Sequence, residues 1–591
     1  MRDLREYLAA LRREGDLVEV TAEVDPKLEI PEIHRRVIAK GGPALLFRNP
    51  RRSRFPLVTN LFGTKKRIEL AFGTRPSEFM KTAARAATEL LPPTAANLWS
   101  FRSFLVRAAR VGTKRTPNAP VTEVVEERFD LNTLPALTTW PGDGGPFLTL
   151  PLVYSEKPAT ELTDRSGHVE SNLGVYRMQV HDDRTLGVHW QIGKGGGFHY
   201  HVAEERGEAL PLTVFLGGPP ALTLGAITPL PEGLPEILLA SLLLGEKLGV
   251  ARLPGHPHPL VATAEFAITG SVPPNVRRSE GPFGDHYGYY SLAHDYPILE
   301  VSRVARRRDA IFPATLVGKP RQEDFFLGEY VEELLAPLFP LLMPAVLDLW
   351  SYGETGFHSL AAAVVKDRYG REAMSSAFRI LGEGQLSLTK FLLLTDARRN
   401  LRDFRGLLVH LLERCRFETD LFVFSNLSMD TLDYTGPRVN EGSKGVLVGL
   451  GEKIRDLPAE WRGSLAAGAR AAIAFAPGAL VVEGPSFPED RDFPERLAGD
   501  PAVAAWPLVV LADDAVRTAA DEASFLWRVF TRFEPGADLH ARKEIVRNHV
   551  ALSPPVVIDA RVKPWMPAEV EADPATCALV DRRWRDYFPR R

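Results

Sequence analysis

The sequence predicts a mixed α/β protein of several domains. Its 591 residues exceed the length over which a single hydrophobic core keeps growing, so two or three domains are expected. Hydrophobic residues make up 45% of the chain and charged residues 25%, values typical of globular domains rather than of disordered or fibrous chains. Helical and strand-like patterns alternate along much of the chain, and this alternation favours the α/β class.

Residues 1–320 divide into two regions with different sequence patterns. Residues 1–117 mix helical spacing, as in residues 4–13, with short apolar runs such as residues 44–47, and we expect a small α/β region there. Residues 118–320 hold many short β-branched or aromatic runs separated by Pro and Gly. Short strand-like runs separated by turn residues predict a mostly β domain.

The second part of the chain returns to an α/β texture. A linking helix is expected within residues 321–345, and strand and helix patterns then alternate through residues 346–518. Residues 519–591 carry helical segments and several prolines but no pattern that assigns them to a packed domain. We treat them as a C-terminal extension and a candidate oligomerisation segment. No internal repeat is evident in the sequence.

Charge and cysteine usage exclude several classes of function. The formal net charge is −3 and no long basic block is present, so we expect no nucleic-acid partner. Cys415 and Cys577 form neither a disulfide framework nor a thiolate zinc motif. The N-terminus has no apolar signal block and every apolar window is interrupted before it reaches membrane-spanning length. A cytoplasmic location without a transmembrane segment is therefore expected.

The segment from Arg278 to Tyr290 holds two carboxylates, Glu280 and Asp285, at the two ends of a Glu-Gly-Pro-Phe-Gly-Asp stretch. Glycine permits unusual backbone angles and the apolar neighbours exclude water, so the two acids can face one cavity. Desolvation favours the protonated form of a carboxyl group and a neighbouring Arg favours the charged form, so one acid could be a proton donor and the other a fixed anion. A surface turn with solvated acids is the alternative.

A second segment, from Ser171 to Val180, is an apolar strand that nevertheless carries Asn172 and Arg177. An Arg in a buried strand needs an anionic partner, which could be a ligand or another part of the protein. A third segment, Gly187 to His201, combines consecutive glycines with Lys194. Such a stretch suits a phosphate but matches no established phosphate-binding motif, and a flexible hairpin is the alternative.

Together these segments resemble the UbiD family of decarboxylases in order, spacing and residue type. The Asn-x-Gly-[Ile/Val]-Tyr-Arg motif of that family corresponds to residues 172–177, and its Glu-Gly-Pro-[Phe/Tyr]-Gly-[Asp/Glu] motif to residues 280–285. The resemblance covers about residues 1–450. Further similar stretches are residues 220–226, 229–233, 386–391 and 442–445.

The resemblance implies an N-terminal α/β region, a flavin-binding split β-barrel at residues 118–320, a linking helix and a C-terminal α/β domain, assembled as a homodimer or homohexamer. It also implies prenylated FMN as cofactor, supplied by a flavin prenyltransferase, together with Mn²⁺ or another divalent cation, with K⁺ as a further candidate ion. The implied reaction is the reversible decarboxylation of an aromatic or α,β-unsaturated acid. Phenolic acids and ubiquinone or menaquinone precursors are candidate substrates, and the direction of the reaction stays open.

Residue by residue, the resemblance makes Arg177, Glu280 and Asp285 the catalytic ion-pair network, with Asp285 as proton donor. It places Asn172 and Glu236 at positions that bind the divalent metal. The residues that fall on cofactor-lining stretches are Val175, Tyr176, Arg177, His189, Trp190, Gln191, Lys194, Gly195 and, from the second domain, Lys444.

The sequence departs from the family pattern at Gly193, where many members have a metal-binding His. Glycine supplies no side-chain ligand. Water, His199 or His201 would have to complete the metal shell, since hard cations that hold phosphate often keep waters. Otherwise the metal and the cofactor bind weakly.

Loss of CO₂ from an sp² carbon leaves an electron pair that side chains cannot accept, so a cofactor is needed as electron sink. Two alternative functions stay open. One is a cofactor-free UbiD-like scaffold subunit of a larger carboxylase. The other is a metal-dependent hydrolase, although the sequence has no recognised metal-ligand spacing. Its candidate residues are His189, His199, His201, Asp285 and His286.

Overall fold

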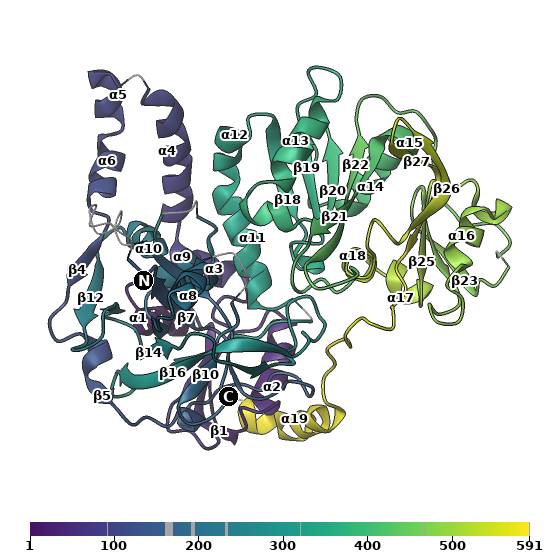
Figure 1. Ribbon diagram of the computed structural model, residues 1–591. Coiled ribbons are helices and arrows are strands. Elements are labelled where there is room, and N and C mark those ends of the chain that lie inside the picture. Colours follow the sequence, from purple (N-terminus) through teal and green to yellow (C-terminus); the bar gives the residue numbers. More distant parts are fainter. Residues whose placement is uncertain are drawn as a thin grey trace. The chain divides into compact units, whose positions relative to one another are not determined.

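The structure is a computed structural model that describes residues 1–91, 93–159, 170–190, 195–230, 234–319, 321–465 and 467–589. It confirms the mixed α/β, multidomain class. The chain forms two compact units, Met1–Leu334 together with Ala568–Arg591, and Leu335–Pro567. The boundary falls inside the helix that runs from Glu323 to Leu335. Each unit is described below by itself (Figure 1).

The first unit begins with a small sheet in the order β1-β2-β3-β17. Its fourth strand comes from far along the sequence and pairs in parallel with β3. Buried apolar residues of this sheet share one hydrophobic core with strands of the central region. The elements are β1 (Leu17–Val24), β2 (Ala44–Pro50), β3 (Leu57–Thr59), β17 (Phe312–Pro313), α1 (Leu4–Arg13), α2 (Glu29–Ile38) and α3 (Lys65–Phe72).

Helix α1 illustrates how the local sequence sets an element. Its N-cap, Asp3, accepts a hydrogen bond from the backbone N–H of Glu6, which satisfies one of the free donors at the helix start. Leu4, Leu8 and Leu11 recur at helical spacing and are buried. Three further helices form a separate arm, in which α4 packs on α6 (Figure 1). They are α4 (Arg75–Glu89), α5 (Ala95–Ser100) and α6 (Arg102–Ala109).

The central region is built on an eight-stranded sheet. Its main path runs β10-β16-β14-β11-β7-β8, with β15 and β5 also paired to β16. Among the described residues this path is open, so the expected barrel does not close there. The strands are β5 (Val124–Glu126), β7 (Leu152–Glu156), β8 (Ser171–Val175), β10 (Thr185–Gly187), β11 (Leu210–Leu216), β14 (Phe266–Val272), β15 (Arg277–Glu280) and β16 (His294–Arg306).

Shorter elements surround this sheet. One of them, β9, and the sheet strand β8 flank the segment that carries Arg177. The small strands are β4 (Thr113–Arg115), β6 (Phe147–Leu148), β9 (Met178–Gln179), β12 (Leu248–Arg252) and β13 (Pro259–Val261). The helices are α8 (Gly195–Glu205), α9 (Pro220–Ile227), α10 (Glu236–Leu244) and α11 (Glu323–Leu335).

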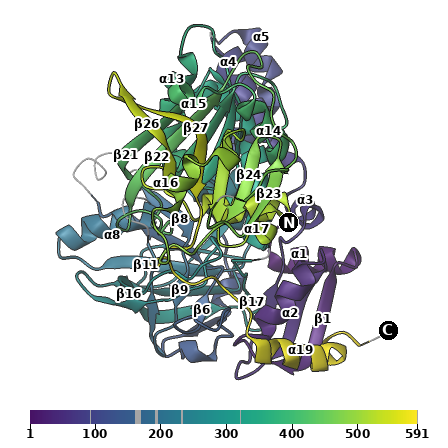
Figure 2. The same cartoon turned by 90° about the vertical axis from the view of Figure 1, so that its right-hand side faces the viewer.

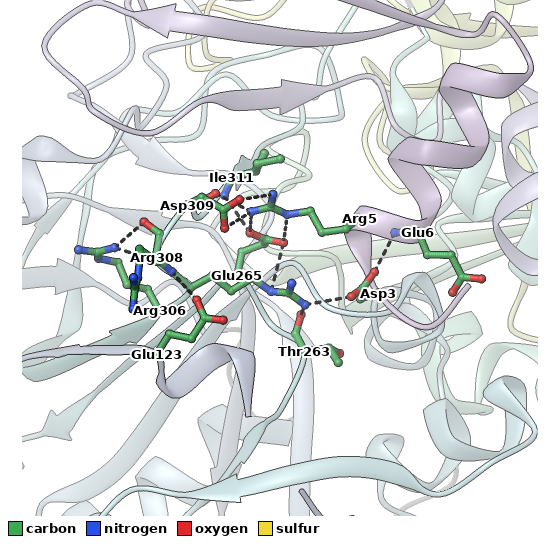
Figure 3. A network of polar contacts seen from close by, with 11 residues as sticks. Asp3, Arg5, Glu6, Glu123, Thr263, Glu265, Arg306, Arg308, Asp309 and Ile311 are labelled. Atoms are coloured by element: carbon green, nitrogen blue, oxygen red, sulfur yellow. Dashed lines mark hydrogen bonds and ion pairs between the residues drawn. The ribbon is translucent and has the colours of Figure 1, made fainter. Parts of the chain in front are cut away.

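A buried ion-pair network fastens α1 to the central sheet (Figure 3). Glu265, which is fully buried, accepts two hydrogen bonds of 2.8 Å from Arg5 and one of 2.9 Å from the backbone N–H of Ile311. Arg307 lies 3.6 Å from the same carboxylate and donates to Asp3 at 2.9 Å. Buried charges are tolerated only when they are paired in this way, so the network joins segments that are distant in sequence.

The end of the chain returns to its beginning. Helix α19 (Pro574–Tyr587) lies beside α2 (Figure 2). Arg36 donates to the carbonyl of Cys577 at 2.9 Å, and Glu29 accepts hydrogen bonds from Arg583 and Tyr587, each at 2.5 Å. The last helix therefore belongs to the first unit.

The second unit contains two five-stranded sheets with the same topology. Their orders are β18-β19-β20-β22-β21 and β23-β24-β25-β27-β26. In each sheet the first pair is antiparallel, the next two are parallel, and the fourth strand pairs antiparallel with the fifth. Residues 471–559, which include part of the expected extension, thus repeat the architecture of residues 346–449.

The first sheet consists of β18 (Val346–Ser351), β19 (Leu360–Val365), β20 (Phe391–Thr395), β21 (Leu421–Ser428) and β22 (Glu441–Gly449). The second consists of β23 (Ala471–Ala476), β24 (Ala479–Glu483), β25 (Leu508–Ala512), β26 (Leu539–Val546) and β27 (His549–Asp559). Their longer helices are α13 (Glu372–Leu381), α14 (Phe404–Leu412), α16 (Phe493–Ala498), α17 (Ala515–Ala519) and α18 (Glu522–Phe530). The shortest are α12 (Phe339–Leu342) and α15 (Phe417–Asp420).

The two sheets share one core but differ at two buried positions. Phe404 packs on Phe525 and Phe530 across the repeats, with ring centroids 5.9 and 5.8 Å apart. In both sheets the fourth strand of the order donates a backbone hydrogen bond to the residue that precedes the third, and that residue is Lys390 in one sheet and Pro507 in the other. In the same register, Lys444 of β22 corresponds to Pro555 of β27. The second sheet therefore has prolines where the first has buried lysines.

No helix in the described ranges is long and apolar enough to cross a membrane.

Candidate active site

Arg177 lies in the turn between β8 and β9 and is shared by two carboxylates. Its Nε and Nη2 donate to the two oxygens of Glu280 at 2.9 and 3.2 Å, and its Nη1 pairs with Asp285. Nη2 also donates to Ser291 at 3.0 Å, and the guanidinium lies over the ring of Phe283, 4.7 Å from its centroid. The three charged residues from separate motifs therefore form one cluster.

The cluster is shielded from water. The side chain of Glu280 is fully buried, and those of Arg177 and Asp285 are 9% and 11% exposed. Burial alone would raise the pKa of Glu280, but hydrogen bonding to His189 and the charge of Arg177 outweigh it and lower the pKa to about 2. Glu280 is therefore the fixed anion of the cluster.

Asp285 is also held as an anion. Burial opposes the charge, but Arg177 and a hydrogen bond from His286 hold the pKa of Asp285 well below its usual range. Its Oδ1 accepts from both the backbone N–H and the Nδ1 of His286, each at 2.7 Å. To act as a proton donor, Asp285 must therefore first receive a proton from a neighbouring group.

His189 follows β10 and borders the same cluster. Its Nδ1 lies 3.1 Å from Glu280 Oε2, and its ring lies against Tyr296 with centroids 4.3 Å apart. Burial and the charge of Arg177 lower the pKa of His189, although Glu280 partly offsets them. At neutral pH the ring is uncharged, and its Nδ1–H donates to the carboxylate.

A second polar group lies at the start of α8. Asn172 donates to the hydroxyl of Tyr176 at 3.3 Å, and Glu236, the first residue of α10, accepts from the backbone N–H of Leu173 at 2.9 Å. A Cβ at Gly195 would lie 2.4 Å from Asn172 Oδ1 and 2.7 Å from the Tyr176 hydroxyl. Only glycine lets the helix start approach these polar atoms so closely. Burial raises the pKa of both Glu236 and Tyr176.

This second group offers what a phosphate and a hard cation need. The start of α8 presents backbone N–H groups, which favour an anion. Asn172 and Glu236 supply amide and carboxylate oxygens, the ligands that Mg²⁺ and Mn²⁺ prefer. The indole Nε1 of Trp190 is buried and has no hydrogen-bond partner within the described residues. An unpartnered buried donor beside this helix start is consistent with a ligand that the chain itself does not provide.

The remaining predicted residues are placed as follows. Val175 ends β8 directly before Tyr176 and Arg177. Gln191, Gly193 and Lys194 lie outside the described residues, so their predicted roles stay predictions. In the second unit, Lys444 donates to the carbonyls of Ser387 and Thr389 at 2.9 and 2.8 Å, and burial lowers its pKa to about 8.

The two histidines proposed to replace a ligand at Gly193 are engaged elsewhere. His199 is buried, with its Nδ1 3.0 Å from the hydroxyl of Ser155, and burial lowers its pKa to about 4. His201 is exposed and lies 3.4 Å from Glu205. Across the described ranges no group of three or more His, Cys, Asp or Glu is placed to hold a metal. The ligand set of the hydrolase alternative is therefore not assembled there.

Sequence reasoning missed two contributors to the site. Ser291 bridges Arg177 and the backbone N–H of Phe283, and no motif marked it. Asp324, at the start of α11, has a buried Oδ1 without a hydrogen-bond partner among the described residues, and burial raises its pKa to about 6. Its charge interacts with those of His286 and Asp285. A carboxylate at a helix start reads as an ordinary N-terminal residue, so no sequence signal indicates this proximity.

Comparison with known families assigns most of this chain. Residues 113–320 match the 3-octaprenyl-4-hydroxybenzoate carboxy-lyase Rift-related domain, residues 8–87 match the N-terminal domain of the same family, and residues 325–449 match its C-terminal domain. The chain belongs to the UbiD family. The carboxy-lyase family suggested by the sequence motifs is thereby confirmed. The second sheet of the repeat lies beyond the last matched residue.

Two relatives match this chain along the whole of the given sequence. A Chlamydia pneumoniae protein, described as one subunit of a 4-hydroxybenzoate decarboxylase, is 47% identical over 589 residues, which is 100% of this chain and 99% of that protein. An uncharacterised protein from Chlamydia trachomatis is 48% identical over 592 residues, 100% of both chains.

Two solved structures share the fold. The UbiD-class enzyme HmfF from Pelotomaculum thermopropionicum, in complex with FMN, has a TM-score of 0.63 at 24% identity and covers 78% of this chain and 97% of its own. Vanillic acid decarboxylase from Sedimentibacter hydroxybenzoicus, in closed form, has a TM-score of 0.67 at 23% identity and covers 79% and 95%.

Proposed function

We propose that this UbiD-family carboxy-lyase decarboxylates an aromatic or α,β-unsaturated carboxylic acid and uses prenylated FMN as its cofactor. The observation that carries the proposal is the guanidinium of Arg177, shared by the buried carboxylates of Glu280 and Asp285. A structural ion pair needs one carboxylate, whereas two on one Arg leave one group free to exchange a proton when a substrate perturbs the balance of charge.

The residues at the start of α8 fit such a cofactor. Asn172 and Glu236 would hold a divalent cation such as Mn²⁺ beside the cofactor phosphate, and the backbone N–H groups of α8 would face that phosphate. Tyr176, Trp190 and Gly195 would line it. When bound, the prenylated flavin supplies the electron sink that decarboxylation at an sp² carbon requires.

The chain's own residues then manage charge and protons. Arg177 would orient the substrate carboxylate, and the cluster's burial would keep water from the reacting carbon. Asp285 would deliver a proton to that carbon after CO₂ leaves, while Glu280 stays ionised and fixes the orientation of Arg177. The neutral ring of His189 would hold Glu280 in place.

The names of relatives narrow the substrate class. A 4-hydroxybenzoate decarboxylase and a vanillic acid decarboxylase both point to phenolic acids. We therefore propose a phenolic or related aromatic acid, with quinone precursors within this class. A flavin prenyltransferase as cofactor supplier and a homo-oligomeric state belong to the same proposal.

The test is to co-express the chain with a flavin prenyltransferase and to measure the bound cofactor by absorbance and mass, the bound metal by elemental analysis, and CO₂ release from 4-hydroxybenzoate and related acids. The proposal expects prenylated FMN, a divalent cation and turnover of at least one acid. Glu236→Gln should lose metal and flavin, whereas Glu246→Gln, with a side chain 44% exposed, should keep both. A protein that binds no flavin under these conditions would instead be a scaffold subunit.

A further inference from the structure

Asp285 can act as a proton donor only if something returns a proton to it. In the folded chain it is a buried anion paired with Arg177. Arg177 cannot release a proton at any working pH, and Glu280, the second carboxylate on that Arg, is fully buried. The return path must therefore pass through another group.

His286 is the partner of Asp285 that solvent reaches. Its side chain is 26% exposed, compared with 11% for Asp285 and none for Glu280. Its Nδ1 lies 2.7 Å from Asp285 Oδ1, close enough for direct proton transfer. The backbone N–H of His286 donates to the same oxygen at 2.7 Å, which fixes the ring relative to the carboxylate.

Asp324 supplies a second carboxyl group near this pair. It comes from the start of α11, which is remote in sequence from the motif loop. Burial raises the pKa of Asp324, the charge of His286 lowers it and the charge of Asp285 raises it further. Its Oδ1 is buried and has no hydrogen-bond partner in the ranges that the structure describes. A carboxylate oxygen is not expected to be buried without a partner unless a ligand, a water or a charged neighbour compensates it. Asp324 can therefore favour the charged form of the imidazole.

We propose that His286 carries protons from solvent to Asp285, and that Asp324 is a positioning residue that stabilises the imidazolium through which this transfer passes. The relay rests on the proposed function, because it serves the proton that Asp285 delivers. Groups that face the ring include Asp285 from its own loop and the ring of Tyr287, with ring centroids 5.0 Å apart, and Asp324 of α11 interacts with the ring through its charge.

The proton balance of the relay closes without a redox step. A solvent proton binds Nε2 of the neutral ring and gives the imidazolium. The proton on Nδ1 then passes to Oδ1 of Asp285, which leaves a neutral carboxylic acid and a neutral imidazole. Asp285 gives this proton to the substrate carbon and returns to the carboxylate, and the ring regains its starting tautomer by exchange with water. One solvent proton is consumed for each CO₂ released.

The first test needs neither substrate nor cofactor. The histidine Cε1–H resonances of the protein are followed by NMR as a function of pH, and the His286→Gln variant identifies the His286 signal among those of the 14 histidines. The Asp324→Asn variant, which keeps the shape and removes the charge, should lower the titration midpoint of His286 by about half a pH unit or more. Asp456→Asn, with a side chain 99% exposed, should leave it unchanged. An equal midpoint in Asp324→Asn and wild type would overturn the role of Asp324.

The second test uses the cofactor-loaded enzyme and an acid that it turns over. His286→Gln should lower kcat about 100-fold or more, keep KM and the bound flavin, and regain activity when imidazole is added. The control His549→Gln, whose ring contacts only a backbone carbonyl at 3.0 Å among the hydrogen bonds of the described residues, should keep its kcat. Full kcat in His286→Gln would overturn the relay and leave the proposed function intact. If wild type turns over no acid, the proposed function fails, and the titration alone decides whether Asp324 controls the charge of His286.

Discussion

Two buried arginine–carboxylate networks in the first unit use the same residue types for different ends. At Glu265 (Figure 3) the carboxylate receives hydrogen bonds from Arg5 and from a backbone N–H, and Arg307 lies nearby. At Arg177 a single guanidinium serves two carboxylates, Glu280 and Asp285. The first network has more cationic than anionic partners at its centre, and the second has the reverse.

This difference separates a network that stabilises the fold from a network that can exchange protons. The surplus of donors at Glu265 fixes its charge and joins α1 to the central sheet. The surplus of acceptors around Arg177, with His286 and Asp324 close by, leaves a proton that can be placed on more than one group. Buried ion pairs alone therefore do not mark an active site, and the Arg177 cluster is the candidate because two buried carboxylates share its one guanidinium.

The largest expected effect is a loss of turnover, and it tests the Arg177 network. Asp285→Asn should keep the shape of the side chain and remove the acid, so kcat should fall by about 10³-fold or more while flavin binding persists. Steady-state CO₂ release and the retained flavin absorbance measure the two quantities. Full activity in this variant would remove Asp285 from the reaction.

The next largest effect is on the free energy of unfolding, and it tests the Glu265 network. Glu265→Ala removes the fully buried counter-charge of the partly buried Arg5 and Arg307, so the free energy of unfolding should fall by about 3–5 kcal/mol. Denaturant unfolding followed by circular dichroism measures this loss. A change below about 1 kcal/mol would show that water replaces the carboxylate and that the network does not hold α1 in place.

Acid should weaken the protein through the second network. The pKa of Glu280 is about 2 in the folded chain and near its ordinary value of about 4.3 when unfolded. The stability that this shift provides is complete above the unfolded value and is lost as the pH falls toward the folded value. Wild type should therefore lose stability between about pH 5 and 2 more steeply than Glu280→Gln when unfolding is measured at each pH. Parallel curves would contradict the assignment.

The smallest expected effect concerns Asp309, an exposed partner of Arg5 in the Glu265 network. Asp309 lies 3.1 Å from Arg5, but its side chain is 78% exposed. Solvent screens such a pair, so Asp309→Asn should change the free energy of unfolding by less than about 1 kcal/mol. This variant is also the matched control for Glu265→Ala. A loss as large as that of Glu265→Ala would mean that burial does not decide which partner of Arg5 matters.

The centre of the site was easier to predict from the sequence than its surroundings. Arg177, Glu280 and Asp285 stand in contiguous motifs, and the structure brings them into contact. Asp324 could not be found in this way, because its proximity to Asp285 depends on where α11 begins relative to the motif loop. Ser291 was missed for the same reason, since its role is set by the turn that returns the chain to Phe283.

The sequence predicted the fold class but not the long-range contacts between strands and helices. Alternating strand and helix patterns indicated the mixed α/β class, yet local patterns could not show that β17 pairs with β3 or that α19 packs on α2. Such long-range contacts depend on complementary surfaces rather than on the periodicity of one segment. The two similar sheets of the second unit were invisible for a related reason, because equivalent positions such as Lys390 and Pro507 differ in chemistry.

The paired sheets of the second unit have a consequence for the descent of this chain. Two copies of one topology in tandem are the expected outcome of duplication within a gene, followed by divergence of one copy. The copy that lies within the matched UbiD C-terminal domain has Lys390 and Lys444, and the other has prolines at the corresponding positions. Strand order therefore reveals a repeat that the amino-acid sequence does not show.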